Sequence, residues 1–150
     1  MSTFIEKTDY KTQLRDQRLD QIIDQDNTIL DEAEETAIQI VKDHLYQLYD
    51  TDTIFAATGS ARKRNVLRWC ICLSIYFLYE RIPDSMVPER VIKNYDDTLE
   101  MLKRVAKGQP ALDLPEKVDE DSEPLTRFRG GSELRRTHGN DFTNTDPNIV

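Results

Sequence analysis

The sequence predicts an all-α protein: a small bundle of three long helices, preceded by short helices and followed by an extended C-terminal arm. Apolar residues recur at the spacing of an amphipathic helix in three segments, around residues 31–49, 60–81 and 87–107. After Pro110 this periodicity stops and polar residues dominate. We therefore expect a helical domain over residues 1–114, and an acidic linker with an extended docking arm over residues 115–150.

Composition excludes several classes of protein. A chain of 150 residues is the size of one domain, which rules out a large multidomain machine. Its net charge of −8 argues against general binding of duplex DNA, which needs a clustered positive surface. The charge is uneven, however: residues 1–58 are net −8, residues 59–109 are net +4 and residues 110–150 are net −4. The positive middle coincides with the most regular helical pattern.

The N-terminal residues predict short helices and a turn. Thr8-Asp9 can cap a short helix that ends near Leu14, and a second short helix includes residues 19–23. Residues 24–27, with the sequence DQDN, are typical of a turn. Their spacing resembles part of a calcium loop, but the required glycine and final glutamate are missing, so a turn and helix cap is the better interpretation.

The first long helix should start near Thr28 or Asp31 and end at residues 50–52. Acidic residues in its first turns suit the positive end of the helix dipole. Its apolar stripe contains Ala37, Val41, Leu45 and Leu48.

The second long helix should run from about Ser60 to Arg81, and Pro83 follows its end. It is apolar almost all round, which indicates a central helix covered on several sides. It contains Arg68 and is too short to span a membrane. Cys70 and Cys72 lie two residues apart and point in different directions, so they cannot bond to each other, and we expect buried free thiols and synthesis in a reducing compartment.

The third long helix should begin near Val87-Pro88, because proline suits a first-turn position. Its buried stripe is Val91, Tyr95, Leu99, Leu102 and Ala106. Gly108 is expected to cap its C-terminus.

The residues after the third helix predict docking on a partner. Residues 111–114 form a short strand or docking segment, and residues 116–123 form a solvated acidic linker. The tail then alternates apolar and polar residues, a pattern that can add a strand to the edge of another protein's sheet. The arginine, leucine and aromatic residues expected to make this contact are Leu125, Arg127, Phe128, Arg129, Arg135, Arg136 and Phe142.

No pattern of catalytic, cofactor-binding or metal-binding residues is present in the sequence. His44 lies at the edge of an amphipathic helix, and His138 lies in the tail. Residues 59–63 lack the spacing of a phosphate-binding loop. We therefore expect a protein that is not an enzyme and that needs no cofactor or metal.

One basic cluster, Arg62, Lys63 and Arg64, with Arg68 one turn later, stands at the predicted start of the second long helix. Positive charge at this end opposes the helix dipole unless it is paired. We favour pairing with acids of the first long helix, within the chain or across a subunit boundary, over nucleic-acid binding. The residues expected to form inter-subunit pairs or to line a channel are Asp31, Glu32, Glu34, Glu35, Arg62, Lys63 and Arg64.

The second and third helices also carry a family resemblance. The first of them ends in Tyr76-Phe77-Leu78-Tyr79-Glu80-Arg81, and Pro83 follows in a short turn. The next helix has Arg90 near its start, a tyrosine at position 95 and a late glycine at position 108. This pattern resembles the head–tail connector (adaptor, or neck) proteins of tailed bacteriophages, and the neck proteins of Mu-like prophages in particular.

The resemblance implies a virion protein made in the host cytoplasm. In such a virion it would form a homo-oligomeric ring of about twelve subunits under the portal protein. The ring would extend the DNA channel, let genomic DNA pass without specific binding, and offer a platform to a stopper or tail-completion protein. The portal would be held by the C-terminal arm, and no membrane is involved.

Two other classes stay open. One is a small DNA-binding or regulatory helical protein that uses the Arg62–Arg68 basic cluster. The other is the accessory subunit of an enzyme, whose partner would order the tail.

Overall fold

The computed structural model describes residues 4–118, and in them the chain is helical, as predicted. The long helices are α2, α4 and α5, and the shorter elements include the 3-10 helices η1, η2 and η3. In chain order the elements are η1 (Lys7–Thr12), α1 (Asp16–Ile23), α2 (Asn27–Leu45), α3 (Thr51–Ala56), η2 (Gly59–Ala61), α4 (Arg64–Tyr79), η3 (Asp84–Met86) and α5 (Glu89–Ala106). The predicted bundle of three long helices is therefore confirmed.

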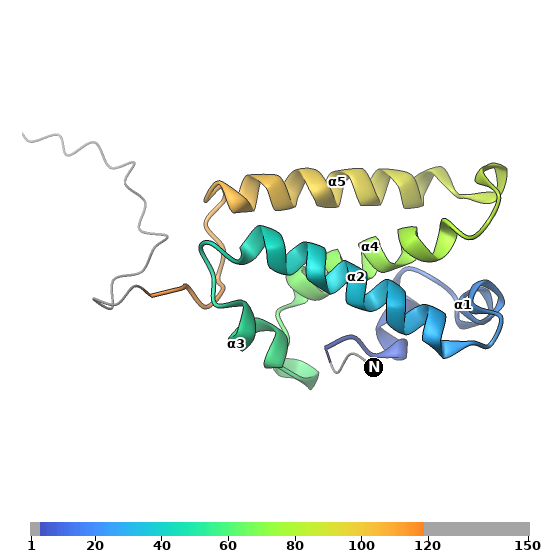
Figure 1. The fold of residues 1–150 in the computed structure, drawn as a ribbon, viewed down its shortest axis with the longest axis horizontal. Coiled ribbons are helices and arrows are strands. Elements are labelled where there is room, and N and C mark those ends of the chain that lie inside the picture. The colour runs from blue at the N-terminus through green and yellow to red at the C-terminus, as the bar shows by residue number, and fades with distance from the viewer. Residues whose placement is uncertain (1–3, 119–150) are drawn as a thin grey trace, which may run out of the picture.

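The three long helices pack against one another in all three pairs, and α1 lies against α2 and α4 (Figure 1). α4 is the central helix, as its composition predicts. Nine of its sixteen residues are buried, among them Cys70, Leu73 and Leu78. Both cysteines are buried and free, which agrees with the prediction. No helix within residues 4–118 is long and apolar enough to cross a membrane.

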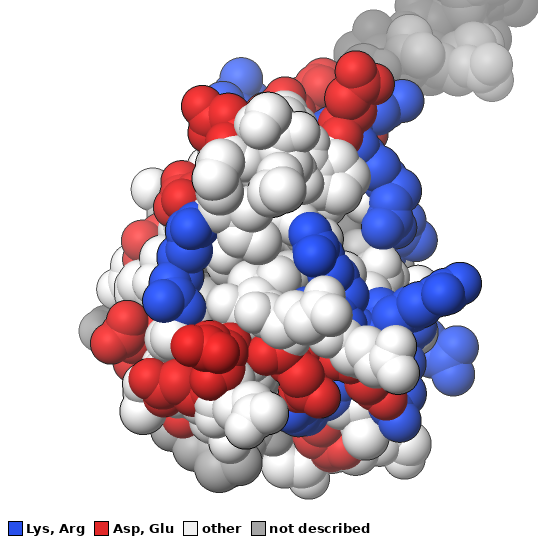
Figure 2. All heavy atoms as spheres, turned by 90° about the vertical axis from the view of Figure 1, so that its right-hand side faces the viewer, with Lys and Arg blue, Asp and Glu red and all other residues white. Residues whose placement is uncertain are grey.

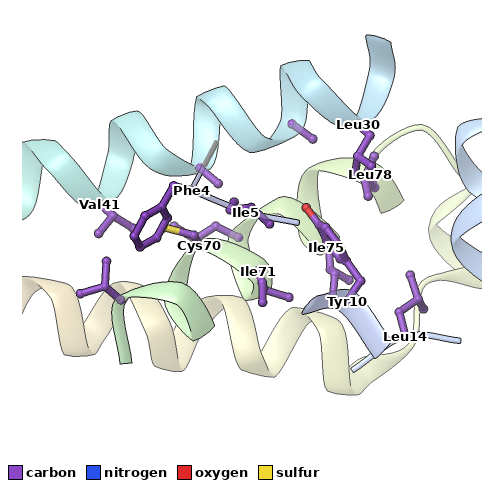
Figure 3. Close-up of a cluster of buried hydrophobic side chains, with 14 of the residues drawn as sticks. Phe4, Ile5, Tyr10, Leu14, Leu30, Val41, Cys70, Ile71, Ile75 and Leu78 are labelled. Carbon is purple, nitrogen blue, oxygen red and sulfur yellow. The ribbon is translucent and has the colours of Figure 1, made fainter. Parts of the chain in front are cut away.

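The N-terminal segment is part of the core. Phe4, Ile5, Tyr10 and Leu14 lie among side chains of α2 and α4 (Figure 3). The ring centroid of Phe4 is 4.7 Å from that of Phe55 on α3. This segment therefore closes one side of the bundle, although the sequence had indicated only short helices and a turn there.

In the middle of the chain, two predicted helix boundaries were wrong and one short helix was missed. α2 ends at Leu45, before Leu48, because the chain turns at residues 46–48. α3 was not predicted; Asp50 caps it by accepting a hydrogen bond from the Thr53 backbone N–H at 3.2 Å. α4 begins at Arg64, since residues 62 and 63 are extended.

The end of α5 agrees with the prediction. Gly108 has φ +78°, a conformation that glycine adopts without strain. The N–H of Gly108 bonds to the carbonyl of Val105, and the N–H of Gln109 bonds to that of Arg104. These two bonds form a Schellman motif, which stops the helix.

After α5 the chain returns to the bundle and pairs with the turn before α3. The Asp50 N–H donates to the Pro115 carbonyl, and the Lys117 N–H donates to the Leu48 carbonyl, both at 2.9 Å. Leu112 and Leu114 pack against the core, so the expected docking segment docks on its own helices and forms no strand. The domain boundary after residue 114 stays a prediction, but residues 115–117 are attached to the helical unit.

Candidate functional site

The predicted basic cluster is divided in the structure, and Arg62 has a structural role. Its side chain is only 9% exposed. The Arg62 Nη1 lies 2.6 Å from the Asp9 carboxylate and donates to the Phe4 carbonyl at 2.8 Å. Arg62 therefore fixes the N-terminal segment to the bundle. The predicted pairing with the acids of the first long helix was wrong for this residue, because η1 occupies the space beside it.

The Asp9 carboxylate that binds Arg62 is also held by a local hydrogen bond. Its carboxylate accepts a hydrogen bond from the Glu6 N–H at 2.8 Å, which forms half of a capping box at the start of η1. A local turn and a long-range ion pair thus share one carboxylate. The arrangement leaves Arg62 no free face for DNA or for a second subunit.

Lys63 pairs with a different segment. Its Nζ lies 2.9 Å from the Asp113 carboxylate, and this hydrogen bond lowers the pKa of Asp113. Both side chains are exposed, so the pair contributes little to stability. It does place residues 112–114 beside the start of α4.

Glu34, which we expected in a channel lining or at a subunit boundary, is buried inside the helical unit. It is 3% exposed, and the Tyr10 hydroxyl donates to its carboxylate at 3.0 Å. Burial raises the pKa of Glu34 to about 7. A residue so placed cannot line a channel, so that prediction was wrong. The sequence did hold a signal, because Glu34 lies on the stripe of Leu30, Ala37 and Val41.

The other acids of the first long helix lie at the surface. Glu32 and Glu35 are exposed, and Asp31 is half-buried. None of the three forms an ion pair with another residue of the described chain. Their assignment to a channel or a subunit boundary stays a prediction.

Arg64 and Arg68 have no such partner in the described chain either, and they line a broad cleft. This cleft has a volume of about 610 Å³ and lies between η1, α4 and α5. Arg90 at the start of α5 joins them and donates to the Gln13 carbonyl at 3.1 Å. The rest of its lining consists of polar side chains with Leu67 and Ile71. We call this feature the arginine cleft.

The distribution of surface charge is also uneven on one end of the molecule. On the face that carries α1 and the α4–α5 turn, Lys and Arg side chains gather along the right-hand edge, while Asp and Glu side chains run across the lower half (Figure 2). The surface therefore offers charge of both signs to a partner.

His44 and Cys70, which the sequence analysis also considered, lie in surroundings typical of a structural role. His44 Nδ1 lies 2.8 Å from the Ile40 carbonyl on its own helix. Burial raises the pKa of the Cys70 thiol. Among residues 4–118 no three His, Cys, Asp or Glu side chains converge as metal ligands. All seven arm residues, from Leu125 to Phe142, lie outside the described residues.

A family model described as bacteriophage Mu Gp36 matches residues 4–128. No curated protein and no solved structure matched the chain.

Proposed function

The chain belongs to the bacteriophage Mu Gp36 family, and we propose that it is a structural virion protein, the subunit of an adaptor ring in the neck. In this proposal the ring docks under the portal protein, extends the DNA channel and provides the attachment platform for a stopper or tail-completion protein. The role needs no cofactor and no enzymatic activity. Family membership carries the phage assignment; the neck position rests on the residue pattern of the second and third long helices.

The layout of the chain supports this role. Residues 4–118 make one helical unit, whose last residues are held against the turn before α3 by two backbone hydrogen bonds. The 32 residues that follow start from this surface and contain the arginine and aromatic residues predicted to dock. A rigid unit that bears a separate docking segment is suited to joining two larger assemblies.

The acids of α2 fit the requirement of a DNA channel. DNA must pass without adhering, and an acidic lining repels phosphate. Asp31, Glu32 and Glu35 lie near the start of α2 and are not neutralised within the described chain. We assign these three, without Glu34, to the lining or to contacts between subunits.

A truncation tests the proposed role of the arm. The chain would be cut after Glu123, so that every contact of residues 115–117 with the helical unit is kept. We expect the full chain to co-purify with the cognate portal and to form rings in negative-stain images. The truncated chain should keep its helical circular dichroism and lose the portal. Portal binding by both chains alike would refute the docking role.

A DNA-binding protein is the second candidate function, because Arg64 and Arg68 are exposed and without a carboxylate partner in the described chain. Phosphate contacts of this kind strengthen as salt is lowered. A gel shift with duplex DNA at low salt, lost in the Arg64→Glu, Arg68→Glu variant, would favour this function over the adaptor. We expect no shift.

A further inference from the structure

The arginine cleft is not explained by the folding of its own chain. Arg64 and Arg68 make no hydrogen bond, ion pair or ring contact with any residue of the described chain, in contrast to Arg62 and Lys63 beside them. Arg90 uses one nitrogen for the Gln13 carbonyl, and its other donors have no partner among residues 4–118. Three guanidinium groups therefore border one cleft, and no carboxylate of the described residues forms an ion pair with them.

The lining selects a class of ligand. Guanidinium groups bind carboxylates in a bidentate manner, and three of them along one cleft suit a ligand that carries several carboxylates in a row. Asp9 also lines the cleft, but its charge is taken by Arg62. Asn94 and Gln13 add polar side chains, and Leu67 adds an apolar contact. A short acidic peptide in an extended conformation has the matching chemistry.

Such a peptide exists in this chain. Residues 119–123 read Asp-Glu-Asp-Ser-Glu, with four carboxylates in five residues, and they follow directly on the last described residue. The arginine cleft and this acidic run are thus complementary in charge.

The acidic run of the same chain starts near the Arg64 end of the cleft, where Lys63 pairs with Asp113, but it is too short to reach Arg90 at the other end. Lys117 is bonded to Leu48, which in turn lies beside Gly108 at the end of α5. Arg90 lies in the first turn of the same helix, at the other end of the molecule (Figure 1). The 18 residues of α5 span about 27 Å. Five extended residues span at most about 17 Å.

We propose that the acidic run, residues 119–123, of one copy binds in the arginine cleft of the next copy. A contact of this kind uses two different surfaces of the same chain, so it repeats head to tail and closes into a ring when the rotation allows. The inference deepens the proposed adaptor ring and rests on it, since it names what holds adjacent subunits together. It also separates the two parts of the tail: residues 119–123 hold the neighbouring subunit and residues 125–142 hold the portal.

A peptide-binding measurement tests the contact without requiring a ring. The receptor is the full chain in which all four acids of the run are changed to lysine, so that its own tail cannot compete. A fluorescent peptide of residues 116–124 is titrated against it. We expect saturable binding that weakens as salt rises. Adding Arg64→Glu and Arg68→Glu should weaken the binding at least tenfold, whereas the matched control Lys93→Glu, exposed on α5 outside the cleft, should leave it unchanged.

A mixing experiment tests the head-to-tail geometry. The cleft variant (Arg64→Glu, Arg68→Glu) keeps its acidic run. The linker variant, in which the four acids of residues 119–123 are changed to lysine, keeps its cleft. Each alone should stay monomeric in sedimentation, and the mixture should give a one-to-one pair that grows no further. Far-UV circular dichroism checks that the variants are folded. The milder Arg68→Gln substitution, made in the linker variant, should also weaken the pair.

The outcomes separate this inference from the adaptor proposal. If the natural chain forms rings and the chain with the cleft substitutions forms them equally well, the adaptor proposal stands and the inference is overturned. If the peptide binds in the cleft but the chain forms no ring with its portal, the contact is supported and the adaptor proposal is overturned. A cleft that binds a duplex oligonucleotide and not the peptide would also overturn the inference.

Discussion

The buried carboxyl group of Glu34 should make the stability of this protein fall as the pH rises towards neutrality. Burial is the main cause of its raised pKa, and the negative charges of Asp31 and Asp9 act in the same direction, against the hydrogen bond from Tyr10. The folded state therefore binds a proton more tightly than the unfolded chain does. Protonation favours folding, and this contribution is lost between the ordinary pKa and the raised one.

The magnitude follows from the two pKa values. A change from 4.5 in the unfolded chain to about 7 in the folded protein corresponds to about 3 kcal/mol, because a tenfold change in proton affinity is worth about 1.4 kcal/mol. Replacement of Glu34 by glutamine removes the titration and keeps an oxygen that can accept from the Tyr10 hydroxyl. We expect the Glu34→Gln protein to be more stable than the natural one above neutral pH, by up to about 3 kcal/mol. At about pH 5 the difference should have fallen below about 1 kcal/mol.

The assay is urea unfolding followed by circular dichroism at several values between about pH 5 and about pH 8. Glu35→Gln is the matched control, since Glu35 is the exposed neighbour of Glu34 on the same helix. The control should keep the pH dependence of the natural chain. Parallel curves for the natural and Glu34→Gln proteins over this range would show that the carboxyl is not buried as described.

Four further predictions concern stability and reactivity. Arg62→Ala leaves the Asp9 carboxylate without its partner in a largely enclosed site, and should cost about 2–4 kcal/mol of unfolding free energy in urea titrations. Leu73→Ala opens a cavity in the fully buried centre of α4 and should cost about 2–5 kcal/mol, measured in the same way. Gly108→Ala places a side chain at φ +78° and should lower stability by about 1–2 kcal/mol; an unchanged denaturation midpoint would contradict the strain argument. The Cys70 thiol should react with a thiol reagent only on unfolding, because it is buried and burial raises its pKa; rapid labelling of the native chain at this position would contradict the packing of α4.

Sequence periodicity was a good guide where a helix buries a regular stripe. Val41, Leu45, Val91 and Leu102 are all buried, and the apolar character of α4 correctly indicated a central helix. The glycine at position 108 could be identified because only a left-handed residue closes a helix in this way. These signals are local, so they are readable from residues that lie close together in the chain.

Partners far apart in the chain could not be read in this way. The cluster of residues 62–64 looked uniform, yet Arg62 binds Asp9, Lys63 binds Asp113 and Arg64 faces the arginine cleft. The separation follows from the path of the backbone, which is extended at residues 62 and 63 and becomes helical at Arg64. Side chains on an extended segment point in different directions, whereas the prediction had placed all three on one helix.

The sequence by itself determined the helical class and the positions of the three long helices, because hydrophobic spacing and caps act over a few residues. Only the tertiary structure decided which charges stay at the surface. The N-terminal segment packs across α2 and α4, and this packing brings Tyr10 to Glu34 and Asp9 to Arg62. It neutralises one arginine of the basic cluster and leaves Arg64 and Arg68 open. Charge pairing depends on distance in space, and that distance is set by packing between segments 24 residues apart for Tyr10 and Glu34 and 53 residues apart for Asp9 and Arg62.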